Sequence, residues 1–428
     1  MTWLTGSIRA TFSVVTEVAR QYNHRIVVVG INYAPENVGT GKYTSEMGAW
    51  LAGRGHGVRV ITAPPYYPAW QVWPGYRSAL FKRERIDGVE VIRCPLWVPK
   101  KPSGLKRLLH LGSFAVSSAL ALSASLVWRP THVISIAPTL ASAPMAWLLA
   151  RLAGARCQLH IQDFELDAAL DMGIVDAGRL KRLAMACERF LLRRFDRVST
   201  ISEKMVERLA AKGVDESKRF LFPNWADIDA IQPLDRPSTY RSELSIPAGA
   251  VVALYSGNMG LKQGLELLGD TAKRLRDKPD LYFVFGGQGP GREALEVQCG
   301  SLPNVRFLDL QPTERLNEWL GLADIHLLPQ RADVADLVMP SKLTGMLASG
   351  RPILATALPG TGVALAIRDS GRTVAPGDPD AFMQALRSLA EDADMRRSLG
   401  QAARQQALST LARANILQRF EQTLLATS

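Results

Sequence analysis

The chain has 428 residues, 47% of them hydrophobic and 21% charged, which excludes a disordered chain and exceeds the size of a single hydrophobic core. Its 51 lysines and arginines outnumber its 40 aspartates and glutamates, and residues 1–225 hold 30 basic against 17 acidic residues, a net of +13. No nucleic-acid module or aromatic-interleaved basic run accompanies this charge, so we expect an anionic membrane surface as the partner and no nucleic acid.

The cysteines and the N-terminal residues predict a cytoplasmic protein. The four cysteines are scattered without the CxxC spacing of metal or redox sites, which is typical of buried thiols in a reducing compartment. Residues 1–24 hold only short apolar pieces and no cleavage site after a long apolar run, so they do not resemble a signal peptide. We expect residues 1–24 to be an extension ahead of the first strand.

The first half of the chain alternates between short apolar runs and helical patterns. The runs are rich in β-branched residues, which suits strands buried on both faces of a parallel sheet. The expected strands are 25–31, 58–62, 89–94, 132–136, 157–161 and 197–201, with helices such as 43–54 and 180–195 between them. This alternation predicts an α/β domain over residues 25–225.

Residues 111–128 form the longest uncharged stretch. Its 18 residues reach the lower limit for a membrane-spanning helix, but five serines and one glycine dilute it. We therefore expect a buried or interfacial helix, and a protein that lies on the cytoplasmic face of a membrane without crossing it.

The second half repeats the α/β pattern. The expected strands are 250–256, 281–285, 305–308, 325–328 and 352–355. Residues 226–241 contain Pro233 and Pro237 in a polar run and are interpreted as a linker, followed by a second α/β domain over 242–400. Residues 401–428 are expected to form a helix that crosses back to the first domain. The fold class is α/β, with two doubly wound Rossmann-like domains.

The turn after the first strand, residues 32–43, is the first candidate site. Gly39 and Gly41 let the backbone approach a ligand at the start of a helix. The turn is not a Walker A loop, because Glu36 stands where the first glycine would be, and it lacks the third glycine of GxGxxG. An ordinary flexible loop is the alternative, but twelve residues exceed the usual connection and favour a ligand-binding loop.

A second candidate site, residues 160–167, closes the fifth expected strand and carries three carboxylates. Helix capping would account for one of them. The others are expected to face a ligand at the carboxyl edge of the sheet.

One glycine turn and one helix start predict an anion site in the second domain. The turn at 255–264 holds Gly257 and Lys262, which would offer backbone donors and a counter-charge to a diphosphate. A surface lysine beside a tight turn is the alternative interpretation. Residues 326–356 read as a strand, a loop, a helix opened by Ser341 as N-cap with Lys342 beside it, and another strand.

The order of these segments, from residue 25 to 400, resembles the GT-B glycosyltransferases of family four. The segments Asn32–Glu36, Pro64–Pro68 and Ala335–Thr344 are similar to its branch of colanic-acid-type exopolysaccharide enzymes. The resemblance implies two domains facing a cleft and a metal-independent enzyme without cofactor. It also implies transfer from a nucleotide-diphosphate sugar, with GDP-fucose the first candidate, to a polyprenyl-diphosphate-linked oligosaccharide.

The resemblance also assigns roles to individual residues. Asp163 and Lys262 are the expected catalytic residues. The expected acceptor contacts are Gly39, Thr40, Gly41 and Tyr43, and the expected donor contacts are Gly257, Asn258, Lys262, Gly287, Gln330, Asp336, Ser341, Lys342 and Leu343.

This sequence departs from the family pattern at three places. The paired glutamates of the family would fall at Leu337 and Gly345, and Asp336 is the nearest acidic residue. Asn258 stands at the place of an arginine. The usual His-Asp at the strand end is Gln162-Asp163, with His160 two residues earlier, which leaves open the residue that positions the acceptor hydroxyl.

Two other functions remain open from the sequence. A nucleotide-sugar epimerase of the same fold would alter its donor without an acceptor. A non-catalytic Rossmann protein would bind NAD, but the GxGxxG fingerprint with its acidic partner is missing.

Overall fold

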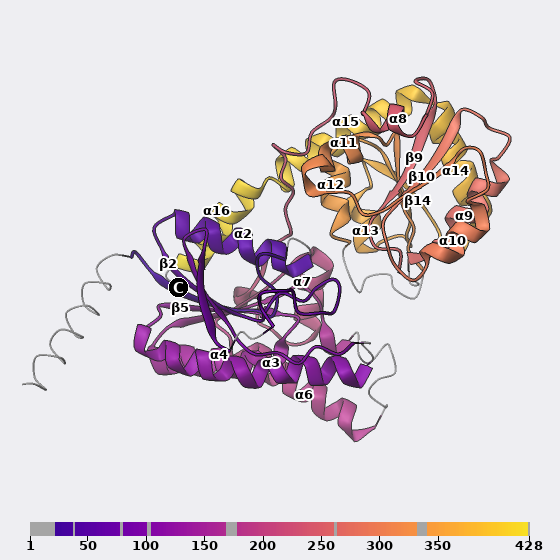
Figure 1. The fold of residues 1–428 in the computed structure, drawn as a ribbon. Helices are drawn as coiled ribbons and strands as arrows, with labels where there is room; N and C mark the ends of the chain where they lie inside the picture. The colour runs from indigo at the N-terminus through magenta and orange to yellow at the C-terminus, as the bar shows by residue number, and fades with distance from the viewer. Residues whose placement is uncertain are drawn as a thin grey trace, which may run out of the picture. The chain divides into compact units, whose positions relative to one another are not determined.

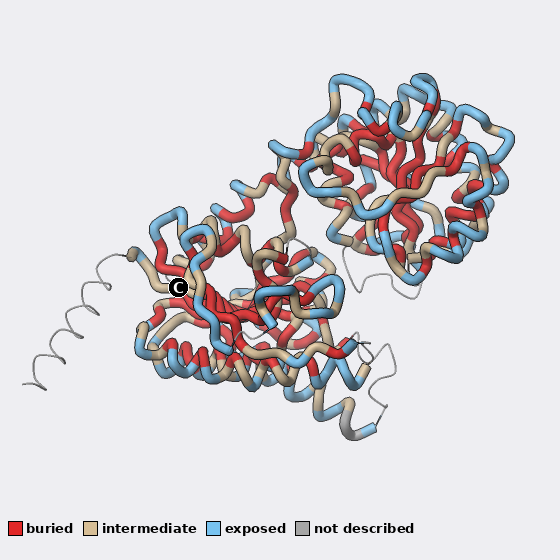
Figure 2. The backbone as a smooth tube through the Cα atoms, viewed as in Figure 1, coloured by how far each residue is buried: buried red, intermediate tan, exposed pale blue. Residues whose placement is uncertain are grey.

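The computed structural model describes residues 22–36, 39–77, 80–100, 104–167, 178–260, 263–331 and 340–426. They fold as two compact units, one of residues 1–222 with 419–428 and one of residues 223–418 (Figure 1). In each unit the central strands are buried, and the helices, the loops and the edge strands carry the exposed residues (Figure 2). The extension expected over residues 1–24 lies almost entirely outside the described residues.

The first unit is built on an eight-stranded sheet of order β3-β4-β2-β1-β5-β6-β7-β8. All neighbours are parallel except β3, which pairs antiparallel with β4. The bounds are β1 Arg25–Val29, β2 Gly57–Thr62, β3 Lys82–Ile86, β4 Val89–Arg93, β5 His132–Ala137, β6 Arg156–Ile161, β7 Arg197–Thr200 and β8 Arg219–Leu221.

Helices cover both faces of this sheet. Helices α3, α4 and α6 are neighbours, and Figure 1 shows them on the face opposite α2. The bounds are α2 Gly39–Gly53, α3 Gly104–Ala124, η1 Ser125–Trp128, η2 Leu140–Ser142, α4 Ala143–Ala153, α6 Arg179–Arg194, α7 Glu203–Ala211 and η3 Glu216–Lys218.

The second unit holds a six-stranded parallel sheet of order β11-β10-β9-β12-β13-β14. Its strands are β9 Val251–Ser256, β10 Leu281–Gly286, β11 Val305–Leu308, β12 Ile325–Leu328, β13 Ile353–Thr356 and β14 Gly371–Val374. Its helices are α8 Tyr240–Glu243, α9 Glu266–Arg274, α10 Arg292–Cys299, η5 Thr313–Arg315, α11 Leu316–Gly321, α12 Lys342–Ala348, α13 Gly362–Ala366, α14 Pro379–Glu391 and α15 Ala393–Thr410.

The last helix, α16 (Arg413–Leu425), begins in the second unit and ends in the first. Within the first unit Phe420 stacks on Phe222, with ring centroids 4.0 Å apart. Glu421 lies 3.0 Å from Nε2 of His56. The end of the chain is therefore held by an aromatic stack and a buried polar contact.

The fold class is the expected one, but local details differ. Residues 226–241, expected as a linker, pack into the second unit, where Ala226, Ile231 and Tyr240 belong to its hydrophobic core. The side chain of Arg404 donates hydrogen bonds to the backbone carbonyls of Ile228 and Ile231. These two carbonyls of the proline-containing segment are therefore paired with a residue outside the segment. The pattern of apolar residues is too sparse there to reveal burial by sequence alone.

Three strands were not expected: β3, β8 and β14. Strand β3 reads Lys-Arg-Glu-Arg-Ile and lies at the sheet edge, where charged side chains protect against unwanted pairing. Strands β8 and β14 are edge strands as well and have only three and four residues. Edge strands bury little, so their sequences lack the apolar run that marks a central strand.

The two strand orders locate the ligand edges. In a doubly wound sheet the ligand crevice lies outside the carboxyl ends of the strands where the order reverses. The order reverses between β1 and β5 in the first unit, and between β9 and β12 in the second. The turns that follow β1, β9 and β12 carry most of the candidate residues, and Asp163 and Gly287 follow the neighbouring strands β6 and β10.

Candidate functional site

In the second unit two glycine turns interlock at the carboxyl ends of β9 and β10. Gly257 and Gly287 have φ angles of 128° and 147°, which strongly favour glycine. A Cβ on Gly287 would lie 1.8 Å from the carbonyl oxygen of Gly257. The amide of Met259 donates to the carbonyl of Gln288 at 2.9 Å, and the amide of Gly291 donates to the carbonyl of Met259 at 2.8 Å. The turns form one rigid backbone layer.

Lys342 is the first residue of α12 and lies beside this layer. Its Cδ would be 3.5 Å from a Cβ on Gly257, and its Nζ lies 4.1 Å from the ring centroid of Tyr255. Nζ is buried and has no hydrogen-bond partner among the described residues, although the side chain as a whole is partly exposed. Burial of Nζ lowers the pKa of Lys342 to about 7. An unpaired buried ammonium favours an anionic ligand at this point.

Tyr255 joins the lysine to the glycine turn. Its ring supports Nζ of Lys342, and its hydroxyl donates to the carbonyl of Asn258 at 2.6 Å. The tyrosine is fully buried. Sequence reasoning did not single it out, because an apolar strand with a tyrosine reads as ordinary core.

The remaining donor candidates differ in what they present. Asn258 is exposed at the turn after β9. Gln330 follows β12, and its backbone amide donates to the hydroxyl of Thr356 at 2.6 Å. Ser341 is exposed, but its side chain makes no cap to α12, contrary to expectation.

Leu343, an expected donor contact, is packed in the core of the second unit. Its side chain is 3% exposed and belongs to the core, and its amide donates to the carbonyl of Pro340. The sequence held a signal for this burial, because Leu343, Met346 and Leu347 are apolar and lie at the spacing of one helix face. Lys262 and Asp336 lie outside the described residues.

In the first unit the turn after β1 is held by Glu36. Its carboxylate accepts hydrogen bonds from the amides of Tyr66 and Tyr67 at 2.6 and 2.7 Å, and from the Asn32 side chain at 2.8 Å. Asn32 in turn accepts a hydrogen bond from the Thr40 hydroxyl at 3.3 Å. The segments 32–36 and 64–68, distant in sequence, therefore form one structure.

The acceptor candidates lie in the first turn of a helix and not in the expected loop. Helix α2 begins at Gly39, so the connection from β1 has nine residues rather than twelve. A Cβ on Gly41 would lie 2.8 Å from the carbonyl oxygen of Glu36, which explains this glycine by close packing. Thr40 is half-buried, whereas Tyr43 is 5% exposed and points mostly into the core.

The end of β6 presents two carboxyl groups at the same edge. Burial raises the pKa of Asp163, opposed by the charge of Arg107. Burial also raises the pKa of Glu165, to about 7, against a hydrogen bond that its Oε2 accepts from the Leu140 amide at 2.8 Å. Oε1 of Glu165 is buried without a partner among the described residues. A carboxyl group with this pKa can exchange a proton near neutral pH.

His160 does not reach this edge. It is 2% exposed, and its ring nitrogens lie 3.0 Å from Ser199 Oγ and from Gln162 Nε2. Burial lowers the pKa of His160 to about 3, so it stays neutral. His160 supports the strand, and the carboxyls with a raised pKa at this edge are Asp163 and Glu165.

A buried ion network fixes the turn that carries these carboxyls. Lys212 donates to Asp167 at 3.0 Å and to Glu188 at 2.5 Å, and Arg208 lies 2.8 Å from Asp167. Lys212 also lies over the ring of Phe164, 5.3 Å from its centroid. Asp167, the third expected carboxylate, therefore has a structural partner set.

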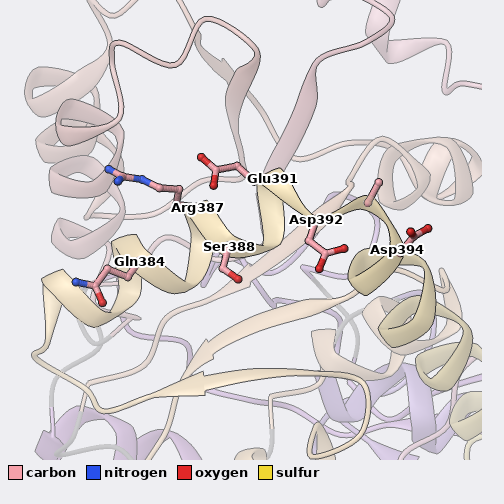
Figure 3. A pocket seen from close by; sticks show the side chains of 7 residues that line it. Gln384, Arg387, Ser388, Glu391, Asp392 and Asp394 are labelled. Carbon is pink, nitrogen blue, oxygen red and sulfur yellow. The ribbon is translucent and has the colours of Figure 1, made fainter.

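A hollow of about 630 Å³ lies elsewhere in the second unit and is lined by side chains from the end of α14 and the start of α15 (Figure 3). Helix α14 begins after the carboxyl end of β14, so its last turn lies away from the ligand edge. Among the described residues, no group of three or more His, Cys, Asp or Glu side chains is arranged to hold a metal.

One helical stretch of the described residues, Gly104–Trp128, is long and apolar enough to span a bilayer, with mean hydropathy 1.6. It is part of the first unit. His110, Phe114, Ser118 and Leu122 line its buried face, which contacts α4, η2 and β2. Its other face is apolar as well, with Leu105, Leu109, Val116, Leu120 and Val127 between 57% and 76% exposed.

Comparison with known families covers both units. Residues 38–225 match the family described as "Glycosyl transferase 4-like domain", and residues 250–392 match "Glycosyl transferases group 1". The chain is 48% identical over 340 residues to WcaI of Escherichia coli (strain K12), which bears the provisional name of a colanic acid biosynthesis glycosyl transferase. This alignment covers 78% of the chain and 83% of WcaI.

Solved structures share the two-unit architecture. Sucrose-phosphate synthase from Thermosynechococcus elongatus matches with a TM-score of 0.72 and 17% identity, over 94% of this chain and 98% of that one. HepE of Anabaena in complex with UDP-glucose matches with a TM-score of 0.68 and 14% identity, over 94% and 99%. These likenesses confirm the expected fold of two parallel-sheet α/β domains.

Proposed function

The chain belongs to the GT-B glycosyltransferases of family four, and from this premise we propose that it transfers a sugar from a nucleoside-diphosphate sugar to a polyprenyl-diphosphate-linked oligosaccharide. The observation that carries the donor half is Lys342, whose buried Nζ, beside the glycine turn of Gly257, has no hydrogen-bond partner among the described residues. A diphosphate would supply that partner.

The chemistry of transfer follows from this arrangement. The leaving nucleoside diphosphate gains negative charge as the glycosidic bond breaks, and Lys342, Lys262 and the backbone amides of the glycine turns stabilise it. We assign Asp163 and Glu165 to take up the proton of the attacking hydroxyl as it bonds to the sugar. Burial raises the pKa of both carboxyl groups, which suits them to accept a proton. The acceptor lies against the first turn of α2, at Thr40.

The biosynthetic setting rests on the relative. WcaI is named for colanic acid biosynthesis, and we assign this chain to the assembly of a similar exopolysaccharide. GDP-fucose is the first donor to test, because the segments Asn32–Glu36 and Pro64–Pro68 are similar to this branch of the family.

We also assign the enzyme to the cytoplasmic face of the plasma membrane, as a peripheral protein. One face of α3 is packed in the first unit and the opposite face exposes leucines and valines, which is the pattern of a helix lying in the membrane interface. Lys100, Lys106 and Arg107 lie at its N-terminal end, each worth about 1 kcal/mol against anionic lipid.

A ligand panel tests the donor assignment. Thermal-shift measurements with GDP, UDP, ADP, their sugars and NAD should show stabilisation by one nucleoside diphosphate and its sugar, and none by NAD. Incubation of the preferred donor with and without membrane lipid extract then separates transfer from epimerisation, because an epimerase changes the sugar without an acceptor. Stabilisation by NAD alone would contradict the proposal.

Vesicle flotation tests the membrane assignment. The enzyme should float with vesicles of phosphatidylglycerol and phosphatidylethanolamine at low salt, and less in high salt or after Leu109→Ser and Leu120→Ser. Leu408→Ser, an exposed leucine of the second unit, is the matched control. Complete recovery in the soluble fraction at low salt would contradict the assignment.

A further inference from the structure

Three aromatic rings form a cluster beside the acceptor loop of the first unit. The rings of Tyr66, Trp70 and His110 contact one another, with centroids 4.8 to 5.7 Å apart and interplanar angles of 51° to 68°. Tyr66 and Trp70 lie in the loop after β2, and His110 lies in the second turn of α3, which follows β4. Both loops leave the carboxyl edge of the sheet, where the acceptor loop begins.

His110 holds an unused hydrogen-bond acceptor in this cluster. Its Nδ1 lies 2.7 Å from the carbonyl oxygen of Trp97, and since a carbonyl only accepts, Nδ1 carries the proton. Burial lowers the pKa of His110, opposed by the hydrogen bond to Trp97 and assisted by the charge of Arg107, and this favours the neutral ring. Its Nε2 is therefore a lone-pair acceptor, buried without a donor among the described residues. Buried acceptors nearly always have partners, which points to a ligand hydroxyl.

Trp70 is presented by a strained and closed loop. Its φ of 53° is rare for a bulky residue, and such outliers concentrate at functional sites. The amides of Gln71 and Trp73 donate to the carbonyls of Tyr66 and Pro65 at 3.1 and 2.9 Å, which closes the loop. The indole itself stays partly exposed.

Arg107 adds a cation to the cluster. Its guanidinium lies 5.7 Å from the centroid of the Trp70 ring and is exposed. Its charge also acts on Asp163 and Glu165 at the end of β6. The cluster and the two exchangeable carboxyls are thus parts of one electrostatic environment within the first unit.

The cluster is also tied to the acceptor loop. Glu36 accepts hydrogen bonds from the backbone amides of Tyr66 and Tyr67 and from Asn32, and Asn32 accepts one from Thr40. A ligand that lies on the rings would therefore be held at a fixed offset from Thr40.

We propose that Trp70, His110 and Arg107 form a subsite for a pyranose ring of the acceptor glycan. One hydroxyl of the sugar donates to Nε2 of His110, and the apolar face of the ring packs on the Trp70 indole. A lipid chain has no hydroxyl and would leave Nε2 unpaired. A sugar ring, whose hydroxyl can donate a hydrogen bond, is therefore the better fit. This inference rests on the proposed function, because it places the acceptor in the first unit.

Two substitutions at one position separate the acceptor role from a structural role. His110→Asn keeps a donor for the Trp97 carbonyl but removes the acceptor at Nε2, whereas His110→Gln restores an amide near Nε2. The probe is a synthetic acceptor with one hexose on a short prenyl diphosphate. We expect His110→Asn and Trp70→Ala each to raise the acceptor KM about 3- to 10-fold, and His110→Gln to recover part of this loss.

The matched control is Trp128→Ala, an aromatic residue at the other end of the same helical stretch that packs on Arg59. It should leave the acceptor KM unchanged, and none of the four variants should change the Kd of the preferred nucleoside diphosphate. Equal acceptor KM values in His110→Asn, Trp70→Ala and the wild type would overturn the subsite.

A binding measurement keeps this test independent of turnover. In protein with ¹⁵N-labelled histidine, the Nε2 resonance that disappears in His110→Asn should shift on addition of the same probe. An unchanged resonance at millimolar probe would overturn the subsite. A shift without any sugar transfer by the wild type would support the subsite and contradict transfer to this class of acceptor.

Discussion

Lys342→Met removes the ammonium group of the donor site while keeping the length of the side chain. If the diphosphate of the donor is the missing partner of Nζ, the substitution loses one charge-assisted hydrogen bond. Such a bond contributes about 1.5–3 kcal/mol, so the Kd of the nucleoside diphosphate should rise roughly 10- to 100-fold.

In the empty protein the same substitution should be stabilising. Burial lowers the pKa of Lys342 to about 7 from an ordinary value of 10.5. Between these values the unfolded chain binds more protons than the folded one, so the free energy of unfolding rises with pH across this window. Lys342→Met should abolish that slope and raise the melting temperature at pH 7, by about 2–4 °C for each kcal/mol recovered.

Calorimetry across pH 7 to 9 completes the test. Binding of the diphosphate takes up one proton at the lysine above pH 7, so the wild-type Kd should weaken by up to about tenfold per pH unit there. Lys342→Met should lack this dependence. The control is Lys278→Met, a lysine on the surface of the same unit paired with Glu391. Lower melting temperature of the empty Lys342→Met protein together with an unchanged Kd would refute the reasoning.

Glu165→Gln should flatten the pH dependence of stability between pH 4.5 and 7, because a carboxyl with its pKa raised to about 7 loses its stabilising contribution as pH rises through that value; urea unfolding at pH 5 and 7.5 measures it. Gly287→Ala should destabilise by roughly 3 kcal/mol by thermal or urea unfolding, whereas Gly249→Ala, with no atom near its Cβ, should be neutral. Lys262→Ala should cut turnover about 10- to 100-fold in a steady-state assay at saturating donor, with the melting temperature unchanged. EDTA should leave turnover intact, because backbone amides and lysines meet the donor charge; loss restored by Mg²⁺ would contradict this.

The candidate residues that follow a strand could be found from sequence, because the signal is local. Gly257, Gly287 and Lys342 each lie within a few residues of a strand end or helix start, where glycine, lysine and the apolar run are read together. Asp163 was found in the same way. The roles of all these residues stay predictions, and Lys262 and Asp336 also lie outside the described residues.

The expected cap of α12 was wrong, because the side chain of Ser341 makes no cap. Leu343 stays a predicted donor contact, with its side chain packed in the core. Residues 226–241, expected as a linker, pack into the second unit, where Ile231 and Tyr240 are buried by residues far away in the chain.

The sequence by itself determined the alternation of strands and helices, the two α/β domains and the glycine turns, because hydrophobic periodicity and backbone freedom are properties of neighbouring residues. Only the tertiary structure decided that Tyr255 lies under Lys342, that Glu36 joins residues 66 and 67 to the acceptor loop, and that Nε2 of His110 has no partner in the part of the chain that the structure describes. These features depend on which segments the sheet order brings together and on which polar atoms lose water, and both are set by long-range packing.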